Sequence, residues 1–369
     1  MTNIAIIHTL PLEFYPPVTN FIDFLSKQDD IELSVFSTGN DKNRQIYKND
    51  SIKIYRFNNL GKSILSKGIS SVLNSFKILF ILLRKKPNIL IYYETFSAGR
   101  VILPCIFFRK KKLIVINHEY FSNEWYQTTA SKSIRFYHKI EQNYLFKKAN
   151  KISQTNADRR KLFLEDNVGL DGNKMILLPN YPSKNWRGKQ IELNSVDILK
   201  TVYVGTLSLD YSYVREYCNW VINKKGKVLF DIYSYNLDDK TKSYVKGLNS
   251  PYIRIFDKGI EYRKIPVQLE GYHVGLVLYK AITKNFQYNA PNKIFEYLAL
   301  DLDVWCSDKL ITARDYERLD CYPKMIMVDY EKLEEFDVDK AINKEELDYV
   351  QSPYVCEPVY KKFLKQILN

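Results

Sequence analysis

The chain has 369 residues, of which 46% are hydrophobic and 26% charged, a balance typical of globular proteins that excludes collagenous, coiled-coil and disordered chains. At about 150 residues per domain, this length predicts two domains. The net charge is +13, and all of the excess lies in residues 1–185, which hold 28 Lys and Arg against 15 Asp and Glu, whereas residues 186–369 hold 27 of each. This division is not expected of a uniformly basic nucleic-acid binder, so the halves should meet different partners.

Short apolar runs alternate with amphipathic segments through the first half of the chain. We expect strands at 3–8, 31–37, 52–57, 89–93, 113–117, 151–154 and 174–178. Helices are expected over 21–27, 63–86, 101–108 and 133–148, with a turn at Pro11, Pro16 and Pro17 after the first strand. This alternation favours a parallel sheet covered by helices on both faces.

The alternation stops at Pro179–Ser183 and a polar stretch that runs to Asp197, so we place a domain boundary there. Further strands are expected at 200–204, 228–233, 253–256, 274–278, 302–306 and 325–328, with helices between most of them. The sequence therefore predicts an α/β fold of two tandem doubly wound, Rossmann-like domains. Ligands of such domains bind at the carboxyl ends of the strands, here in the cleft between the domains.

Several common active-site patterns are absent from the sequence. GxGxxG, GxxxxGK[ST], HExxH and GxSxG do not occur, which weighs against dehydrogenases, P-loop enzymes, zincins and α/β-hydrolases. The five Cys have no CxxC spacing, so neither a zinc ribbon nor a disulfide framework is indicated. His8, His138 and His273 show no metal-ligand spacing, and no metal site is expected.

The most informative segment begins at Asn289 and reads NAPNKIFEYLA. Pro291 suits the first turn of a helix, and the free N–H groups of residues 292–294 would then point outward beside the positive end of the helix dipole, where a diphosphate can bind. Glu296, one turn later, could accept hydrogen bonds from two ribose hydroxyls. The alternative is purely structural, because Pro opens helices and Glu favours their N-terminal dipole end.

APNKIFEYLAL resembles the nucleotide-sugar signature of GT-B glycosyltransferases, in the group similar to the retaining family-4 enzymes (glycosyl transferases group 1) of bacterial surface-polysaccharide synthesis. The segments 151–183, 201–207 and 253–280 resemble the same family in the same order, so the resemblance covers most of residues 113–308. It implies two Rossmann-like domains facing across a cleft: an acceptor-binding domain over 1–185 and a nucleotide-sugar-binding domain over 186–357. A closing helix over 358–369 would cross back to the first domain.

The resemblance also implies donor-binding residues. Tyr288 stands where many family members carry a glutamate close to the donor sugar, and the Arg and Lys that commonly follow the glycine turn are absent here. Substitutes for these cations would be Arg215, Arg263, Lys264 or Lys293. The residues expected to bind the donor are Gly205, Thr206, Arg263, Tyr288, Asn289, Ala290, Pro291, Asn292, Lys293, Ile294 and Glu296.

His118 and Glu119 follow the strand expected at 113–117 and resemble the HD or HE motif of the family. The resemblance implies that His118 contacts the donor sugar near the reaction centre, and Glu119 is a candidate general base. The structural alternatives are a histidine that caps a strand end and an ordinary loop acid. His8 lies near the loop after the first strand, where it either lines the acceptor cleft or simply packs.

Asp301-Leu302-Asp303 has the DxD spacing that binds Mn or Mg in other glycosyltransferases. We do not expect a metal here, because the family has a turn into a strand at this place and Asp favours such turns. No cofactor is expected besides a nucleotide-diphosphate sugar as co-substrate.

Two basic clusters, Arg84–Lys86 and Arg109–Lys112, each follow an apolar stretch in the first half. Apolar residues joined to cations suit an anionic membrane surface, although cations are also common at helix C-termini. We therefore expect a cytoplasmic protein that lies peripherally on the inner face of the plasma membrane, and no nucleic-acid partner.

Together these features predict a glycosyltransferase that moves a sugar from a nucleotide-diphosphate donor to a lipid-linked or soluble glycan acceptor in bacterial capsule, O-antigen or exopolysaccharide synthesis. The resemblance implies transfer with retention of configuration and without a metal. One alternative is a nucleotide-sugar epimerase or hydrolase on the same fold, and another is a non-catalytic GT-B scaffold.

Overall fold

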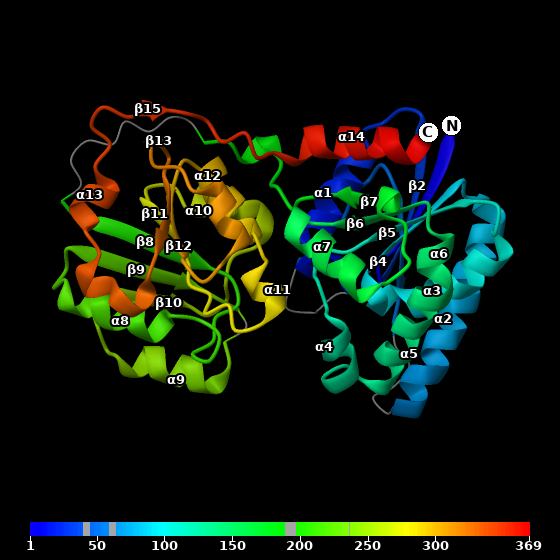
Figure 1. The fold of residues 1–369 in the computed structure, drawn as a ribbon, viewed down its shortest axis with the longest axis horizontal. Coiled ribbons are helices and arrows are strands. Elements are labelled where there is room, and N and C mark those ends of the chain that lie inside the picture. Colours follow the sequence, from blue (N-terminus) through cyan, green and yellow to red (C-terminus); the bar gives the residue numbers. More distant parts are fainter. Residues whose placement is uncertain (40–44, 59–63, 189–196, 236) are drawn as a thin grey trace. The chain divides into compact units, whose positions relative to one another are not determined.

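The structure is a computed structural model that describes residues 1–39, 45–58, 64–188, 197–235 and 237–369, with the side chains of 64–68 left out. Residue 63 of the expected helix and residues 189–196 of the expected linker lie outside the described residues. The chain forms two compact units: residues 1–180 with 357–369, and residues 181–356 (Figure 1). We call them unit 1 and unit 2 and describe each by itself.

Unit 1 is built on a seven-stranded parallel sheet in the order β3-β2-β1-β4-β5-β6-β7. The apolar residues of alternate strand positions pack against α2, α3, α6 and α7, among them Ile7, Tyr92 and Val115, which are fully buried. The strands are β1 (Thr2–Ile7), β2 (Ile31–Thr38), β3 (Lys53–Phe57), β4 (Ile89–Tyr93), β5 (Lys112–Ile116), β6 (Lys151–Gln154) and β7 (Met175–Leu177). The helices are α1 (Pro16–Leu25), α2 (Ile64–Lys85), α3 (Glu94–Phe107), α4 (Asn123–Thr128), α5 (Lys132–Ile140), α6 (Phe146–Lys148), α7 (Ala157–Asp166) and α14 (Cys356–Leu368).

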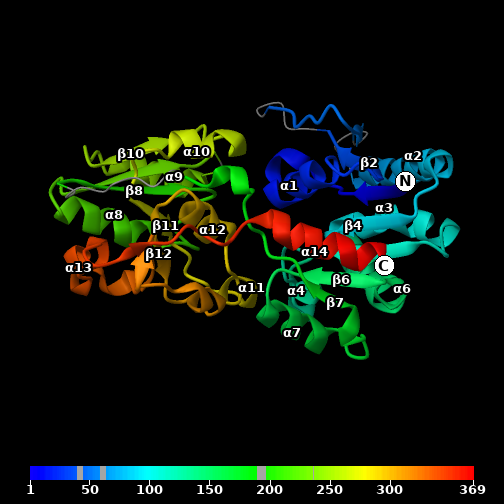
Figure 2. The same ribbon diagram turned by 90° about the horizontal axis from the view of Figure 1, so that it is seen from above.

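The last helix of the chain, α14, packs against α1 of unit 1 (Figure 2). The ring of Tyr360 meets that of Phe21 at a centroid distance of 5.0 Å, and its hydroxyl donates to the Pro17 carbonyl at 3.1 Å. Lys112, at the start of β5, donates from Nζ to the Leu368 carbonyl at 2.7 Å. Aromatic packing and this C-terminal cap therefore fix α14 to unit 1.

Unit 2 is built on a six-stranded parallel sheet in the order β10-β9-β8-β11-β12-β14. One face packs against α8 and α9 and the other against α10 and α12. The strands are β8 (Leu199–Val204), β9 (Val228–Tyr233), β10 (Ile253–Phe256), β11 (Val274–Val277), β12 (Asp303–Ser307) and β14 (Met325–Val328), with the short pair β13 (Cys321–Tyr322) and β15 (Asp348–Tyr349). The helices are α8 (Val214–Asn223), α9 (Asp239–Gly247), α10 (Ile265–Gln268), α11 (Lys284–Gln287), α12 (Asn292–Ala299) and α13 (Val338–Ile342).

The expectation of two doubly wound parallel sheets is confirmed. Three helices differ from it. The prolines Pro16 and Pro17 open α1 instead of lying in a turn, because a fixed φ and a missing N–H suit the first helical turn. α3 begins at Glu94, seven residues earlier than expected, and a π turn over Glu141–Leu145 interrupts the helix expected at 133–148.

No helix within the described residues combines the length and the apolar character needed to cross a membrane.

Candidate functional site

In unit 1, polar residues gather where the strand order reverses. β1 lies between β2 and β4, and β4 pairs with β5, so the carboxyl ends of β1, β4 and β5 are neighbours at the topological switch point of the sheet. His8 follows β1, Glu94 follows β4, and His118 comes two residues after β5. Open α/β sheets bind ligands at such a point.

His118 is held in one orientation. Its Nδ1 lies 2.7 Å from Oδ1 of Asn180, and its ring stacks on Tyr93 at a centroid distance of 5.2 Å. Burial lowers the pKa of His118 to about 4, so the imidazole is neutral near pH 7. Because the Asn180 oxygen accepts, Nδ1 carries the proton and Nε2 is an acceptor. Nε2 is buried and has no hydrogen-bond partner among the described residues.

Glu94 supports the backbone that carries His118. Its Oε1 accepts hydrogen bonds from the N–H groups of His118 at 2.6 Å and Glu119 at 3.2 Å. Its φ of 58° lies in the left-handed region that a residue with a side chain rarely adopts, which costs on the order of 1–3 kcal/mol. Burial raises the pKa of Glu94 from 4.5 to about 8. Sequence reasoning missed this residue, although a carboxylate directly after the buried run Ile89–Tyr93 was a visible signal.

Glu119, the candidate general base, is paired with a buried cation. Its Oε2 lies 3.1 Å from the guanidinium of Arg159, which also donates to the His118 carbonyl at 2.8 Å. Arg159 is only 1% exposed and belongs to α7, whose N-cap is Asn156. Arg159 therefore joins the loop after β5 to α7, and the role of Glu119 as a base stays a prediction.

His8 lies at the same edge as His118, and the rings of both histidines contact Tyr93. Its ring contacts Tyr15 at 4.6 Å and Tyr93 at 5.6 Å, and its Nδ1 lies 2.8 Å from the Leu10 carbonyl. Burial lowers the pKa of His8 to about 3, so this imidazole is neutral as well. Two neutral imidazoles thus flank one tyrosine ring at the switch point of unit 1.

In unit 2, the corresponding reversal lies between β8 and β11. Gly205 follows β8 with a φ of +145°, in the range that favours glycine, and its N–H donates to the Tyr233 carbonyl at 3.0 Å. The Thr206 carbonyl accepts from the Tyr203 hydroxyl at 2.7 Å. A Cβ built on Gly205 would lie 3.9 Å from Cε of Lys293, so the side chain of Lys293 reaches the glycine turn.

Helix α12 is fixed against both strands of this reversal. Gly275 on β11 has no side chain, which leaves room for the ring of Tyr297, since a Cβ there would lie within 2.2 Å of that ring. The hydroxyl of Tyr297 accepts from the Val204 N–H at 3.0 Å. The N-terminus of α12 is thereby placed beside the glycine turn.

The N-terminus of α12 differs in detail from the expectation. Pro291 is the N-cap in an extended conformation, and Asn292 is the first helical residue. The Ile294 N–H donates to the Pro291 carbonyl at 3.0 Å, so the expectation that it is free was wrong. The N–H groups of Asn292 and Lys293 have no backbone partner among the described residues. Two amides, not three, remain open to an anion.

Glu296 is buried and paired. Its side chain is 4% exposed, and its Oε2 lies 2.5 Å from Nζ of Lys293. Lys293 is the nearer of the two to solvent, with 21% of its side chain exposed. The ribose contact expected of Glu296 stays a prediction, and the structure adds that this carboxylate holds Lys293, whose side chain reaches the Gly205 turn.

The segment before α12 forms a short turn. Thr283 caps α11, the Tyr288 N–H donates to Lys284, and the Asn289 N–H donates to Phe286. The side chains of Tyr288, Asn289 and Ala290 are each partly buried.

Two of the other proposed phosphate-binding cations are engaged elsewhere. Arg215 lies over the ring of Tyr244, between α8 and α9, and Lys264 pairs with Glu261 at 3.0 Å. Arg263 is exposed in the turn before α10.

Lys280, which sequence reasoning did not select, follows β11. It lies 3.2 Å from Glu216 and 3.4 Å from the Leu209 carbonyl, in the loop after β8. The signal was available, since Lys280 ends the apolar run VGLVLY at a strand's carboxyl end.

The two DxD aspartates are engaged in local bonds. Asp301 accepts from the Tyr349 hydroxyl at 2.9 Å, and Asp303 accepts from the Lys324 N–H at 2.7 Å and lies 3.3 Å from Lys344. Among the described residues, no three His, Cys, Asp or Glu side chains gather as a metal site would require.

No family model and no curated protein matches the sequence. Similar solved structures are found over the whole chain. The lipopolysaccharide outer core galactosyltransferase WaaB is 13% identical with a TM-score of 0.62, covering 100% of this chain and 99% of its own. Sucrose-phosphate synthase of Thermosynechococcus elongatus is 11% identical with a TM-score of 0.67, covering 99% and 98%. UDP-GlcNAc 2-epimerase of Neisseria meningitidis, bound to UDP-GlcNAc, is 13% identical with a TM-score of 0.58, covering 100% of both chains.

At these identities the likeness shows the fold and not the activity. Both transferases and epimerases are among the similar structures. The sheets of seven and six parallel strands, together with these neighbours, show that the chain has the GT-B fold.

Proposed function

We propose that this protein is a glycosyltransferase that moves a sugar from a nucleotide-diphosphate donor to a glycan acceptor. The observation that carries the proposal is the arrangement in unit 2, where Lys293 reaches the Gly205 turn and the N–H groups of Asn292 and Lys293 stay open. A cation and two amides at the positive end of a helix suit a diphosphate. They would stabilise its charge as it leaves, which needs no metal.

Unit 1 would supply the group that positions the sugar. The Nε2 atom of His118 is a buried acceptor with a fixed orientation, and a sugar hydroxyl is the donor that such an atom takes. Glu119 would act beside it as the base or as the partner of Arg159. Retention of configuration is part of the proposal because the resembling family retains it.

The proposed partners follow from the same reasoning. Solved neighbours bound to UDP and to UDP-GlcNAc support a nucleotide-sugar ligand. The acceptor would be a lipid-linked or soluble glycan of bacterial surface-polysaccharide synthesis. The protein would act in the cytoplasm, on the inner face of the plasma membrane, through the basic unit 1.

A second candidate is a nucleotide-sugar epimerase or hydrolase, because several solved neighbours are UDP-GlcNAc 2-epimerases, including one from Methanocaldococcus jannaschii with a TM-score of 0.63. The distinguishing experiment is to incubate the protein with a panel of nucleotide sugars, with and without glycan acceptors. A transferase forms nucleoside diphosphate only together with an acceptor product. Epimerised or hydrolysed sugar without any acceptor would contradict the transferase proposal.

The site itself is tested by nucleotide binding. If Glu296 holds the ribose, the protein binds UDP, GDP or ADP more tightly than the matching 2′-deoxynucleotide, and Glu296→Gln removes that preference and weakens binding by about 1.5–3 kcal/mol. If Lys293 holds the diphosphate, Lys293→Met with Glu296→Gln weakens diphosphate binding further than Glu296→Gln alone. The matched control is Lys246→Met, which removes an exposed cation of α9. Unchanged affinity in all variants would show that the diphosphate does not bind here.

A further inference from the structure

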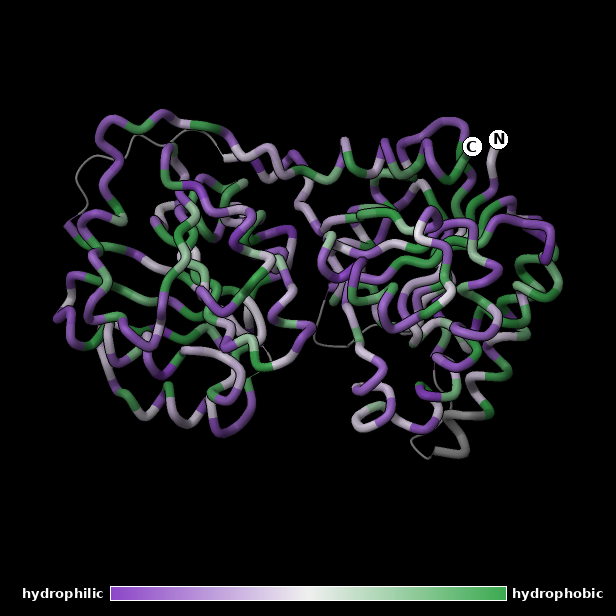
Figure 3. Tube along the Cα trace, viewed as in Figure 1, coloured by the Kyte–Doolittle hydropathy of each residue, from purple (hydrophilic) through white to green (hydrophobic). Residues whose placement is uncertain are grey.

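Helix α2 of unit 1 exposes a row of large apolar side chains. They are between 44% and 56% exposed. Figure 3 shows the apolar character of α2 as green segments along the outer side of unit 1. The six residues, which we call the α2 stripe, are Ile69, Val72, Leu73, Phe76, Phe80 and Leu83.

The α2 stripe is continuous in space. At 3.6 residues per turn, its six positions fall within an arc of about 100° and extend over about 21 Å of the helix. The opposite face carries Ile78 and Leu82, which are fully buried in the core of unit 1. α2 is therefore apolar on two faces, and the described residues cover only one of them.

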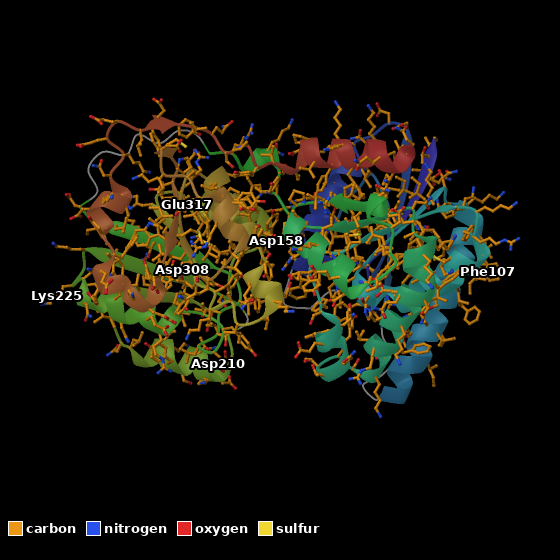
Figure 4. The ribbon with its side chains drawn as sticks, viewed as in Figure 1. Phe107, Asp158, Asp210, Lys225, Asp308 and Glu317 are labelled. Atoms are coloured by element: carbon orange, nitrogen blue, oxygen red, sulfur yellow. The ribbon has the colours of Figure 1, made fainter. Side chains whose placement is uncertain are left out.

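The neighbouring helix extends this surface. α3 packs along α2 and ends in Ile106 and Phe107, which are 52% and 61% exposed. Figure 4 marks Phe107 at the outer edge of unit 1. Exposed apolar residues that gather in this way mark an interaction site, whereas single ones are normal.

Cations border the apolar surface. One basic cluster lies between α2 and β4, and the other lies between α3 and β5. β4 and β5 are paired, with Ile89 opposite Lys112, so both clusters lie at the same edge of the sheet. Arg84 lies over the ring of Phe80 at 4.2 Å. Within the two basic clusters, the exposed cations without an ion pair among the described residues are Arg84, Lys86, Arg109, Lys110 and Lys111.

Two cations of these clusters serve the fold instead. Lys85 pairs with Glu32 at 2.8 Å, and Lys112 donates to the Leu368 carbonyl of α14. The basic clusters thus offer five cations that are unpaired among the described residues, fewer than the seven in the sequence. The exposed apolar side chains therefore make up the larger part of this surface.

We propose that the α2 stripe, with Ile106 and Phe107, inserts into the surface of an anionic lipid bilayer, with α2 lying in the plane of the interface. Amphipathic helices bind in this way when aromatic and aliphatic residues lie beside Lys and Arg. Charge decides against a second copy of the chain as the occupant, because two copies would bring the same unpaired cations together, whereas anionic headgroups complement them. The proposal does not rest on the transferase reaction, since no residue of the candidate site takes part.

The proposal predicts two separable components of binding. Attraction of the cations to anionic lipid is screened by salt, whereas burial of apolar side chains is not. Wild type should therefore bind vesicles most tightly at low salt and retain a salt-resistant part. The apolar variant Phe76→Gln, Phe80→Gln and Leu83→Gln should lose that part, because Gln keeps the helix propensity while removing the apolar surface.

The experiment is co-sedimentation with vesicles of phosphatidylcholine containing about 30% phosphatidylglycerol, at about 0.05 M and about 0.5 M salt. The partition coefficient of the apolar variant should fall at least tenfold at both salt concentrations. A charge variant, with Gln at the five unpaired cations, should fall at least tenfold at low salt only.

The control also carries three substitutions by Gln, at exposed apolar residues outside the surface: Val168→Gln, Leu319→Gln and Val350→Gln. It should bind vesicles as wild type does, and circular dichroism melting should show that all variants fold.

Two results would overturn the proposal. One is equal vesicle binding by the apolar variant and the control. The other is a wild-type dimer in analytical ultracentrifugation that the apolar variant alone disperses, because this would assign the stripe to a second copy.

Discussion

Replacing Glu94 by Gln should change how the stability of unit 1 depends on pH. The carboxyl of Glu94 is buried, and its pKa rises from 4.5 to about 8 in the folded chain. The unfolded chain releases this proton near pH 4.5, whereas the folded chain keeps it until about pH 8. The folded state therefore loses stability as the pH rises through this interval.

The magnitude follows from the two pKa values. Each pH unit between them costs about 1.4 kcal/mol, so the loss accumulates to about 5 kcal/mol above pH 8. Gln has no proton to release, and its oxygen can still accept from the N–H groups of His118 and Glu119. The free energy of unfolding of Glu94→Gln should therefore be close to that of wild type near pH 4.5 and exceed it increasingly up to pH 8.

The assay is urea unfolding at half-unit steps of pH, combined with hydrogen exchange of the peptide that contains the His118 and Glu119 amides. Exchange reports unit 1 locally, which matters because two units need not unfold together. The control Glu165→Gln changes an exposed carboxyl on α7. A difference between Glu94→Gln and wild type that stays constant with pH would show that Glu94 ionises normally, and the reasoning would fail.

Three other variants test separate features. Burial lowers the pKa of His118 to about 4, so wild type should lose up to about 3 kcal/mol of stability from this group as the pH falls from 6.5 to 4. His118→Asn, which keeps a donor to Asn180, should not show this loss in urea unfolding. Gly205→Ala should cost about 1–3 kcal/mol in thermal unfolding, since a Cβ has room there but the φ of +145° is strained for Ala; a smaller cost would mean that the turn relaxes. Tyr360→Ala should cost about 3–5 kcal/mol and raise hydrogen exchange in α1, whereas an unchanged α1 would show that α14 does not support it.

Most of the fold could be predicted because the spacing of apolar residues and the positions of helix-ending residues such as proline are local properties of the sequence. The short apolar runs at 31–37 and 89–93 became β2 and β4, and Pro87 marks the end of α2. The start of α3 could not be predicted in this way. Glu94 begins the helix in a left-handed conformation, and the bonds that hold it there come from residues more than twenty positions later.

The candidate site was predicted in part. The sequence pointed to the helix after Pro291 and to the histidine after β5, because both positions follow from strand ends and helix starts. It could not show that Lys293 turns toward Glu296 and Gly205, since a side-chain direction depends on the packing of Tyr297 on Gly275. It also could not separate Lys85 and Lys112, which serve the fold, from the unpaired cations beside them.

The placement of α14 has a consequence for synthesis on the ribosome. Unit 2 is one unbroken stretch, 181–356, and its two ends meet where the Cys356 N–H donates to the Pro182 carbonyl at 2.9 Å. Unit 2 can therefore condense without α14, whereas unit 1 is complete only when its last thirteen residues have left the ribosome. Until Tyr360 arrives, Phe21 has no aromatic partner from α14, and a nascent chain stalled before α14 would present that apolar side of α1 to chaperones.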